Sequence, residues 1–250
     1  MEAKPTAPAP APARARERSQ PSLTIARYLE AVYYLSHEGE VVRPGRLAEW
    51  LGVGAPTVSA ALQRMRRDDL IAVARDHPVR LTAQGSRTAA AIVRRHRVAE
   101  RWLTDTLGFD WATADEEAGP MAHALSDQVV DRLHRLLGSP ATCPHGNQIP
   151  GEPTSSRRLV RLSQAEPGRS ARVGRISELA EHEAPELLRL LDREGIRPGA
   201  QVEVGPWSGR ASVRTIGVEG RTVRLGDAAA RAIWVEPDPG AGRRRSASSR

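Results

Sequence analysis

The chain lacks most features that would mark it as a secreted or membrane protein. Its 250 residues include a single cysteine, Cys143, which excludes a disulfide framework and any zinc or iron–sulfur site built from several cysteines. No apolar run approaches the ~20 residues of a membrane span. The Ala/Pro-rich start of the chain also lacks the apolar core of a signal peptide. We therefore expect an intracellular, cytoplasmic protein that contacts no membrane.

Sequence motifs of common enzyme classes are missing as well. The chain has no Gly-rich phosphate loop, no Gly-x-Ser-x-Gly nucleophile turn and no His-Glu-x-x-His helix. We therefore expect a protein that is not an enzyme and has no catalytic residues.

Positive charge is in excess and is concentrated in one segment. The net charge is +7, and residues 43–80 hold seven arginines against four acidic residues. A basic surface of this kind suits the phosphates of nucleic acid.

A helix that reads DNA is predicted over residues 54–65. Pro56 suits a first helical turn, and Val58, Leu62 and Met65 recur at helical spacing as an apolar stripe. The remaining positions point outward and offer small or hydrogen-bonding side chains to a major groove: Thr57, Ser59, Ala60, Gln63 and Arg64.

The flanking segments complete a winged helix-turn-helix over residues 22–82. A first amphipathic helix is predicted at 22–37 and a short second helix at 44–51, ended by Gly52. Two strand-like runs, 70–74 and 79–82, follow the predicted DNA-reading helix and form the wing. Arg80 on the wing and Arg64 are expected to contact phosphates.

Two more units follow, so the expected fold class is mainly α with small β parts. Helices predicted at 83–107, 112–125 and from 126 to 137 form a unit (83–150) that is too apolar for a monomer surface and is expected to make a homodimer. A linker (151–157) leads to six short strand-like runs and one helix (186–193), which predict a small SH3-like barrel at 158–237. Residues 1–21 are expected to form a disordered Ala/Pro leader, and 238–250 a disordered basic tail.

The chain resembles the diphtheria-toxin-repressor family of metal-dependent transcriptional regulators over residues 23–237. The motifs that carry the resemblance lie at 55–59, 95–101, 125–127, 143–151 and, in the SH3-like part, 190–204. The resemblance implies a dimeric, metal-responsive repressor of metal-homeostasis genes that binds a palindromic operator in double-stranded DNA. It also implies a divalent metal cofactor, with manganese or iron favoured and zinc or cobalt as alternatives.

The resemblance also assigns metal ligands. The family's ancillary site uses a His and a Glu four residues apart on the long helix, and His96 and Glu100 match them. Asp115 occupies a third ligand position, and Glu183 and Glu186 match two more in the SH3-like module. The alternative is that His96 is an interface histidine and that Glu100 pairs with an arginine.

The family's primary metal site is degenerate here. Its ligand positions read Arg27, Gly119, Ala122 and His123, and a guanidinium has no acceptor atom for a metal. In one interpretation, Arg27 is an internal replacement for the ion, paired with Glu30, Glu116 or Glu117. In the other, metal control is kept through the five-residue ancillary site, which bridges the dimerisation unit and the SH3-like module. A rearranged site using Glu30, Glu117 and His123 is a further alternative.

Cys143 and His145 flank a proline in a Gly/Pro-rich turn. Two ligands are too few for a zinc site, so we interpret these residues as a turn.

A second function is the alternative to metal control. It is a metal-independent regulator gated by a small organic ligand or by a partner protein bound to the SH3-like module.

We predict distinct effects for two DNA-facing residues. Gln63→Ala should relax sequence preference because Gln63 is placed at a base edge, whereas Arg80→Ala should weaken all sequences alike and lower the salt slope by about one phosphate contact. Salt-dependent titrations of matched and scrambled duplexes measure both effects. A Gln63→Ala protein with unchanged affinity and preference would show that the wrong helix face has been assigned.

Overall fold

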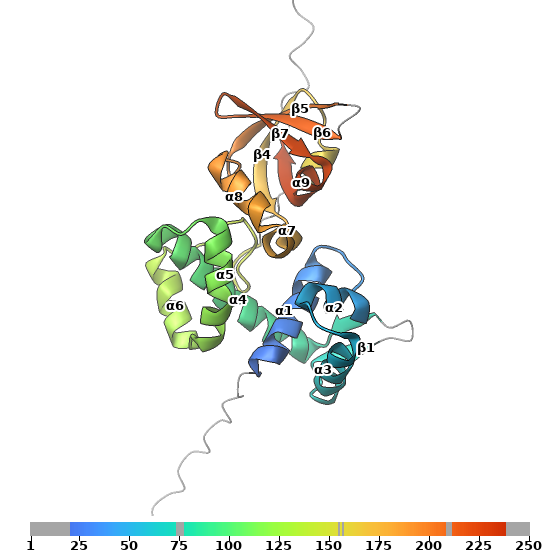
Figure 1. The fold of residues 1–250 in the computed structure, drawn as a ribbon. Coiled ribbons are helices and arrows are strands. Elements are labelled where there is room, and N and C mark those ends of the chain that lie inside the picture. Colours follow the sequence, from blue (N-terminus) through green and yellow to red (C-terminus); the bar gives the residue numbers. More distant parts are fainter. Residues whose placement is uncertain (1–20, 74–77, 155, 157, 209–211, 239–250) are drawn as a thin grey trace, which may run out of the picture.

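The chain folds into three units that contact one another (Figure 1). The computed structural model describes residues 21–73, 78–154, 156, 158–208 and 212–238. Residues 1–20 of the predicted leader, the turn of the wing and nearly all of the predicted tail lie outside the described residues. None of the described helices is long and apolar enough to cross a membrane.

The N-terminal unit is a winged helix-turn-helix, as predicted. It contains α1 (Leu23–His37), α2 (Pro44–Leu51) and α3 (Ala55–Arg67), followed by the antiparallel pair β1 (Ile71–Val73) and β2 (Val79–Leu81). Gly52 ends α2 in the left-handed region at φ 64°, a conformation that glycine adopts at little cost. The apolar stripe of α3 packs into the core of this unit through Val58, Leu62 and Met65.

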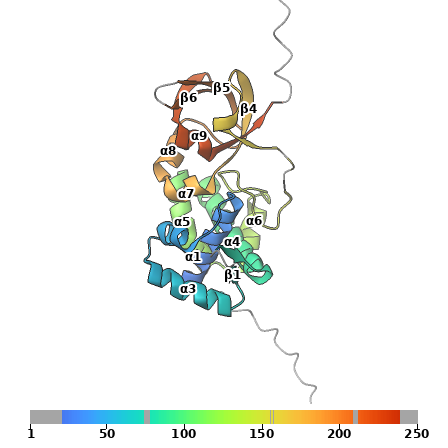
Figure 2. The ribbon, with the colours of Figure 1, turned by 90° about the vertical axis from the view of Figure 1, so that its right-hand side faces the viewer.

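A helical unit follows, and its first helix contributes side chains to two hydrophobic cores, that of the winged unit and that of the helical unit. It consists of α4 (Ala83–Leu107), α5 (Trp111–Ala124) and α6 (Asp127–Leu136). The N-terminal half of α4 packs into the winged unit through Ala89 and Ile92, while its C-terminal half packs against α5. Figure 2 shows α4 beside α1 and near the level of α6. The helix therefore joins the two units rigidly.

The C-terminal unit is the predicted small barrel, an antiparallel sheet in the order β3-β8-β4-β5-β6-β7. Its elements are β3 (Val160–Arg161), the 3₁₀ turn η1 (Leu162–Gln164), β4 (Arg169–Ile176), α7 (Glu178–Glu183), α8 (Pro185–Arg193), β5 (Gln201–Ser208), β6 (Val213–Val218), β7 (Arg221–Gly226), α9 (Asp227–Ala232) and β8 (Ile233–Pro237). The sequence pattern missed α7 and α9, since six residues are too few to display a helical period. It also assigned 159–162 to one strand, whereas the strand ends at Arg161 and a 3₁₀ turn follows.

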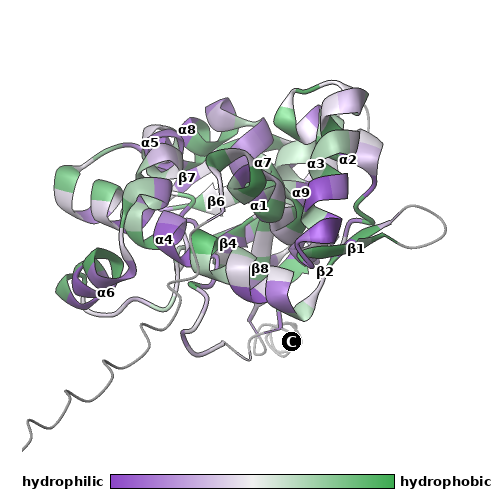
Figure 3. Cartoon of the chain, turned by 90° about the horizontal axis from the view of Figure 1, so that it is seen from below, coloured by the Kyte–Doolittle hydropathy of each residue, from purple (hydrophilic) through white to green (hydrophobic). Residues whose placement is uncertain are grey.

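Two helices of the C-terminal unit, α7 and α8, contact the other two units. α8 packs against α5, whose Trp111 enters the barrel core, and α7 contacts α1. Away from this junction, α6 lies at the edge of the molecule with hydrophobic and hydrophilic residues along it (Figure 3). Large exposed apolar side chains gather in the helical unit: Leu107, Phe109, Val129 and Leu136. They are available to a second subunit.

Gly85 of α4 packs closely against the backbone of Leu70, just before the wing strand β1. A Cβ at Gly85 would lie 1.8 Å from the carbonyl oxygen of Leu70, so we predict that Gly85→Ala lowers the free energy of unfolding by about 1–3 kcal/mol through overpacking. Gly119→Ala in α5 is the matched control, because no atom lies within 4 Å of its new Cβ. That change should stabilise by about 0.5–1 kcal/mol. Urea unfolding measures both, and equal effects of the two changes would contradict the packing argument.

Candidate metal centre

The centre is built where a glycine-containing loop folds against α4. In this loop the Cys143 N–H donates to the Asn147 carbonyl at 2.8 Å, and the Gly146 N–H donates to the Cys143 carbonyl at 3.0 Å. Gly146 has φ 87°, and a Cβ there would lie 2.4 Å from the Gly174 carbonyl oxygen of β4. Only glycine fits this position, which lets the loop turn its side chains towards α4.

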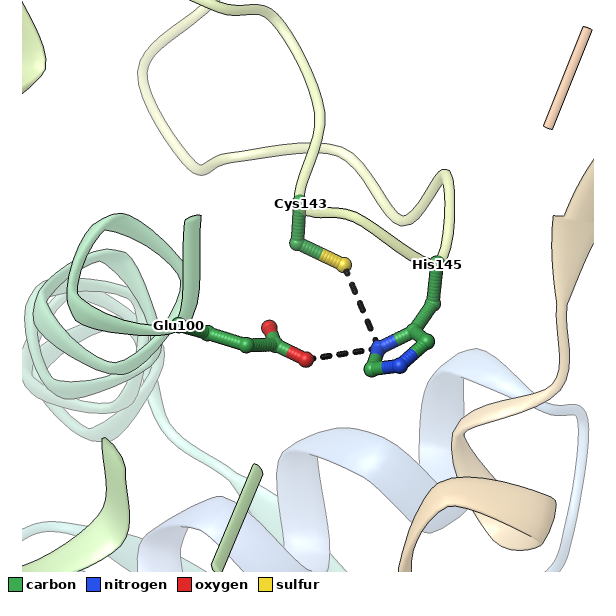
Figure 4. Close-up of side chains that lie close together, drawn as sticks. All are labelled: Glu100, Cys143 and His145. Atoms are coloured by element: carbon green, nitrogen blue, oxygen red, sulfur yellow. Dashed lines mark hydrogen bonds and ion pairs between the residues drawn. The ribbon is translucent and has the colours of Figure 1, made fainter. Parts of the chain in front are cut away.

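Glu100, Cys143 and His145 form the first group of donors (Figure 4). His145 Nδ1 lies 2.6 Å from Glu100 Oε1 and 4.0 Å from Cys143 Sγ. All three residues are buried, with His145 fully excluded from solvent. Glu181 of α7 adds a carboxylate oxygen 3.6 Å from the same His145 nitrogen. The interpretation of Cys143 and His145 as a turn alone was therefore too narrow.

His96, Glu100 and Asp115 form a second group that shares Glu100 with the first. His96 and Glu100 lie one helical turn apart on α4 and therefore face the same way. The His96 Nε2–H donates to Asp115 Oδ1 of α5 at 3.1 Å. We call the five residues of the two groups, His96, Glu100, Asp115, Cys143 and His145, the Glu100 centre.

Charges in this centre shift its proton equilibria. Burial alone would lower the pKa of both histidines, but Asp115 beside His96, and Glu100 and Glu181 beside His145, outweigh burial and raise each pKa to about 9. Burial raises the pKa of Glu181 and of the Cys143 thiol, and for Cys143 the Glu100 charge adds to the effect. Without an ion, the centre therefore holds protons near neutral pH.

The donor set fits a divalent cation. Glu100 Oε2 and His145 Nε2 are buried without a hydrogen-bond partner in the described part of the chain, and such groups are costly unless something pairs with them. One imidazole with two carboxylates suits manganese or ferrous iron, while the group with a thiolate and an imidazole also suits zinc or cobalt. A bound ion would displace the protons and satisfy the buried oxygens.

Two residues predicted as ligands lie elsewhere. Glu183 Oε1 is 2.7 Å from an Arg46 nitrogen of α2, and the Glu186 side chain is 86% exposed and pairs with Arg189 at 2.6 Å. Neither joins the donors at Glu100. Glu181 takes the position beside the centre instead, because the short helix α7 turns residue 181 inward. That helix was not visible in the sequence pattern.

The degenerate site does not assemble as a metal site within the described residues. Arg27 and Glu117 are exposed, Ala122 is buried, and Gly119 and His123 are partly exposed. In the part of the chain that the structure describes, Arg27 forms no ion pair with Glu30, Glu116 or Glu117, although its charge acts on Glu30. Glu30 is half-buried, and His96 and Asp115 are close enough for their charges to act on it. Desolvation raises the pKa of Glu30, and the charges of His96 and Arg27 oppose that rise. The pairing expected of Arg27 is thus not formed in this structure.

The predicted DNA-reading side chains lie on the surface. Thr57, Ser59, Ala60, Gln63 and Arg64 on α3 are all exposed, and so is Arg80 on β2. Arg66 and Arg67, which the sequence reasoning did not single out, are exposed at the C-terminal end of the same helix.

Three family profiles match successive parts of the chain. Residues 22–79 match the family described as "Iron dependent repressor, N-terminal DNA binding domain", and residues 82–151 match "Iron dependent repressor, metal binding and dimerisation domain". Residues 160–237 match "FeoA domain". The three matches coincide with the three structural units.

Individual relatives agree with the profiles. The diphtheria toxin repressor of Corynebacterium diphtheriae is 34% identical over 223 residues, covering 85% of this chain and 96% of the relative. The iron-dependent repressor IdeR of Mycobacterium tuberculosis is 38% identical over 192 residues, covering 72% and 83% respectively.

Solved structures show the same arrangement. A manganese-dependent transcriptional repressor in complex with manganese superposes with a TM-score of 0.75 at 33% identity, over 86% of this chain and all of the other. ScaR with bound Zn²⁺ superposes with a TM-score of 0.71 at 25% identity, over 85% and 98%.

The raised histidine pKa values predict a pH dependence of stability. A histidine with pKa about 9 in the folded protein, against ~6.5 when unfolded, stabilises the fold fully below pH ~6.5 and loses this contribution as pH rises through about 9. Urea unfolding of ion-free protein should therefore give a free energy that falls between these values. His145→Gln should flatten the fall. A wild-type stability that is constant or rises over the same range would contradict the assignment.

Proposed function

The chain belongs to the iron-dependent repressor family that includes the diphtheria toxin repressor, and on this premise we propose that a divalent ion at the Glu100 centre controls its binding to DNA. Members of the family are transcriptional repressors, not enzymes. The observation that carries the proposal is one buried carboxylate shared by two groups of donors. When bound, an ion would link α4 to α5 and to the loop of Cys143, replacing protons that the centre otherwise holds.

The DNA side of the proposal rests on exposure and charge. α3 presents Thr57, Ser59, Ala60 and Gln63 for base edges, while Arg64 and Arg80 contact phosphates. Two copies joined through the exposed apolar side chains of the helical unit would bind a palindromic operator in double-stranded DNA, because a two-fold dimer matches a two-fold site.

Metal homeostasis is the process that such a switch serves. We assign manganese or iron as the physiological ion, since carboxylates and imidazole dominate the centre and relatives are named for iron or manganese dependence. The target genes are then those that import or store this ion. Gating by a small organic ligand or a partner protein is less favoured, because the relatives depend on metal.

Metal analysis with ligand variants tests the proposal. Full-length protein dialysed against Mn²⁺ should retain the ion, and His96→Ala or Cys143→Ser should weaken its binding by at least about tenfold. His123→Ala is the matched control, because this half-buried histidine of the degenerate site lies outside both donor groups. It should leave ion binding unchanged.

The same proteins are then tested on DNA. A duplex selected from random sequences by Mn²⁺-loaded wild type should be released when a chelator is added, by about 5- to 150-fold in affinity. Loss of ion binding in His123→Ala with retention in His96→Ala would contradict the proposed centre. A wild type that binds no ion, yet binds the duplex, would establish the metal-independent alternative.

A further inference from the structure

The short helix α7 lies between the Glu100 centre and the winged helix-turn-helix. It follows β4 of the barrel, begins after the buried Ser177, and has only six residues. Figure 1 shows it at the junction of the barrel with the two lower units. It contacts α1, and its Leu179 packs against the core of the N-terminal unit.

One face of α7 lies beside the Glu100 centre. Glu181 lies 3.6 Å from His145 Nδ1. The side-chain amide of Asn147, in the same loop as Cys143 and His145, donates to Glu181 Oε1 and to the Ile176 carbonyl, the latter at 3.0 Å. Direct contacts therefore join α7 to the loop that carries Cys143 and His145.

The next two residues of α7 contact α2. The His182 ring stacks on Trp50, with centroids 4.1 Å apart and an interplanar angle of 11°, and its Nε2–H donates to the Trp50 carbonyl at 2.9 Å. Glu183 pairs with Arg46 at 2.7 Å. α2 packs against α3, the predicted DNA-reading helix.

The first turn of α7 is tied to the same units by buried charges. Glu178 pairs with Arg97 of α4, and its N–H donates to Glu38 Oε1 at 3.1 Å. Glu38 also pairs with Arg175 at the end of β4, which donates to Asn147 Oδ1 at 3.2 Å. These contacts leave α7 little freedom to turn on its own.

We propose that α7 is the element through which an ion at the Glu100 centre sets the orientation of the helix-turn-helix, with His182 and Glu183 as positioning residues. A turn of an α-helix holds 3.6 residues, so the backbones of Glu181 and His182 lie in the same turn of α7 and move together. An ion that draws Glu181 towards the centre therefore moves or fixes Trp50 and Arg46 as well. The inference rests on the proposed function, because it requires an ion at the centre.

Hydrogen exchange of the full-length protein tests this connection without DNA. Adding Mn²⁺ to wild type should slow exchange in the loop 142–150, in α7 and in α2. In His182→Ala the slowing should persist in the loop but be lost in α2. Glu183→Ala, a change at a side chain that is 43% exposed, should give the same pattern and does not threaten folding. Arg231→Ala is the control, since its 2.7 Å ion pair is with Asp227 on the same exposed face of α9 and involves neither α7 nor α2.

DNA titration gives a second readout on the selected duplex. Wild type and Arg231→Ala should show the full effect of Mn²⁺ on affinity, about 5- to 150-fold. His182→Ala and Glu183→Ala should show a markedly smaller ratio at unchanged Mn²⁺ affinity in the absence of DNA. A merely structural role would weaken DNA binding equally with and without Mn²⁺ and would overturn the inference.

The outcomes also separate this inference from the proposed function. A wild type that binds Mn²⁺ and releases DNA on chelation, but whose α2 exchange ignores the ion, overturns the role of α7 alone. A wild type that binds no Mn²⁺ overturns the proposed function and this inference together.

Discussion

The carboxylate of Glu100 is 1% exposed and has two histidines, a thiol and two other carboxylates around it. A buried carboxylate without enough donors is costly, and this one is retained on the helix that joins the winged unit to the rest of the chain. Without an ion, the histidines stay protonated to about pH 9 and supply the missing charge. A divalent ion would offer the same compensation in one step. On the proposed function, the orientation of α4, α5, the loop 142–150 and α7 would depend on whether protons or the ion supply this charge.

Arg97 connects the helix that carries Glu100 to the other two units. It lies three residues before Glu100 on α4, is 4% exposed, pairs with Glu178 of the barrel, and has its guanidinium 5.8 Å from the ring centroids of Tyr33 and Tyr34 on α1. One side chain thus joins all three units at their junction. Removing one partner of such a buried pair would leave an unpaired charge at the junction of the units, which is strongly destabilising.

Elements whose bounds depend on local periodicity and capping residues could be predicted from the sequence. The bounds of the long helix α4 were predicted correctly because Thr82 caps it and Gly108 ends it, and the alternation of short strands predicted the barrel. The position of Cys143 and His145 beside Glu100 could not be predicted, because they reach it only after a loop folds against α4. That loop needs a left-handed backbone and a close approach to β4 at residue 146, which glycine permits. Glu183 was assigned by resemblance in place of Glu181, since α7 is too short to show which of its carboxylates faces inward.

Anomalous diffraction from crystals of the full-length protein grown with Zn²⁺ or Mn²⁺ tests the central claim most directly, because it locates ions independently of any variant. The account predicts density for an ion beside the Glu100 carboxylate, in contact with donors from His96 and Asp115, from Cys143 and His145, or from both groups. Density beside His123 and Glu117, with none at Glu100, would contradict it.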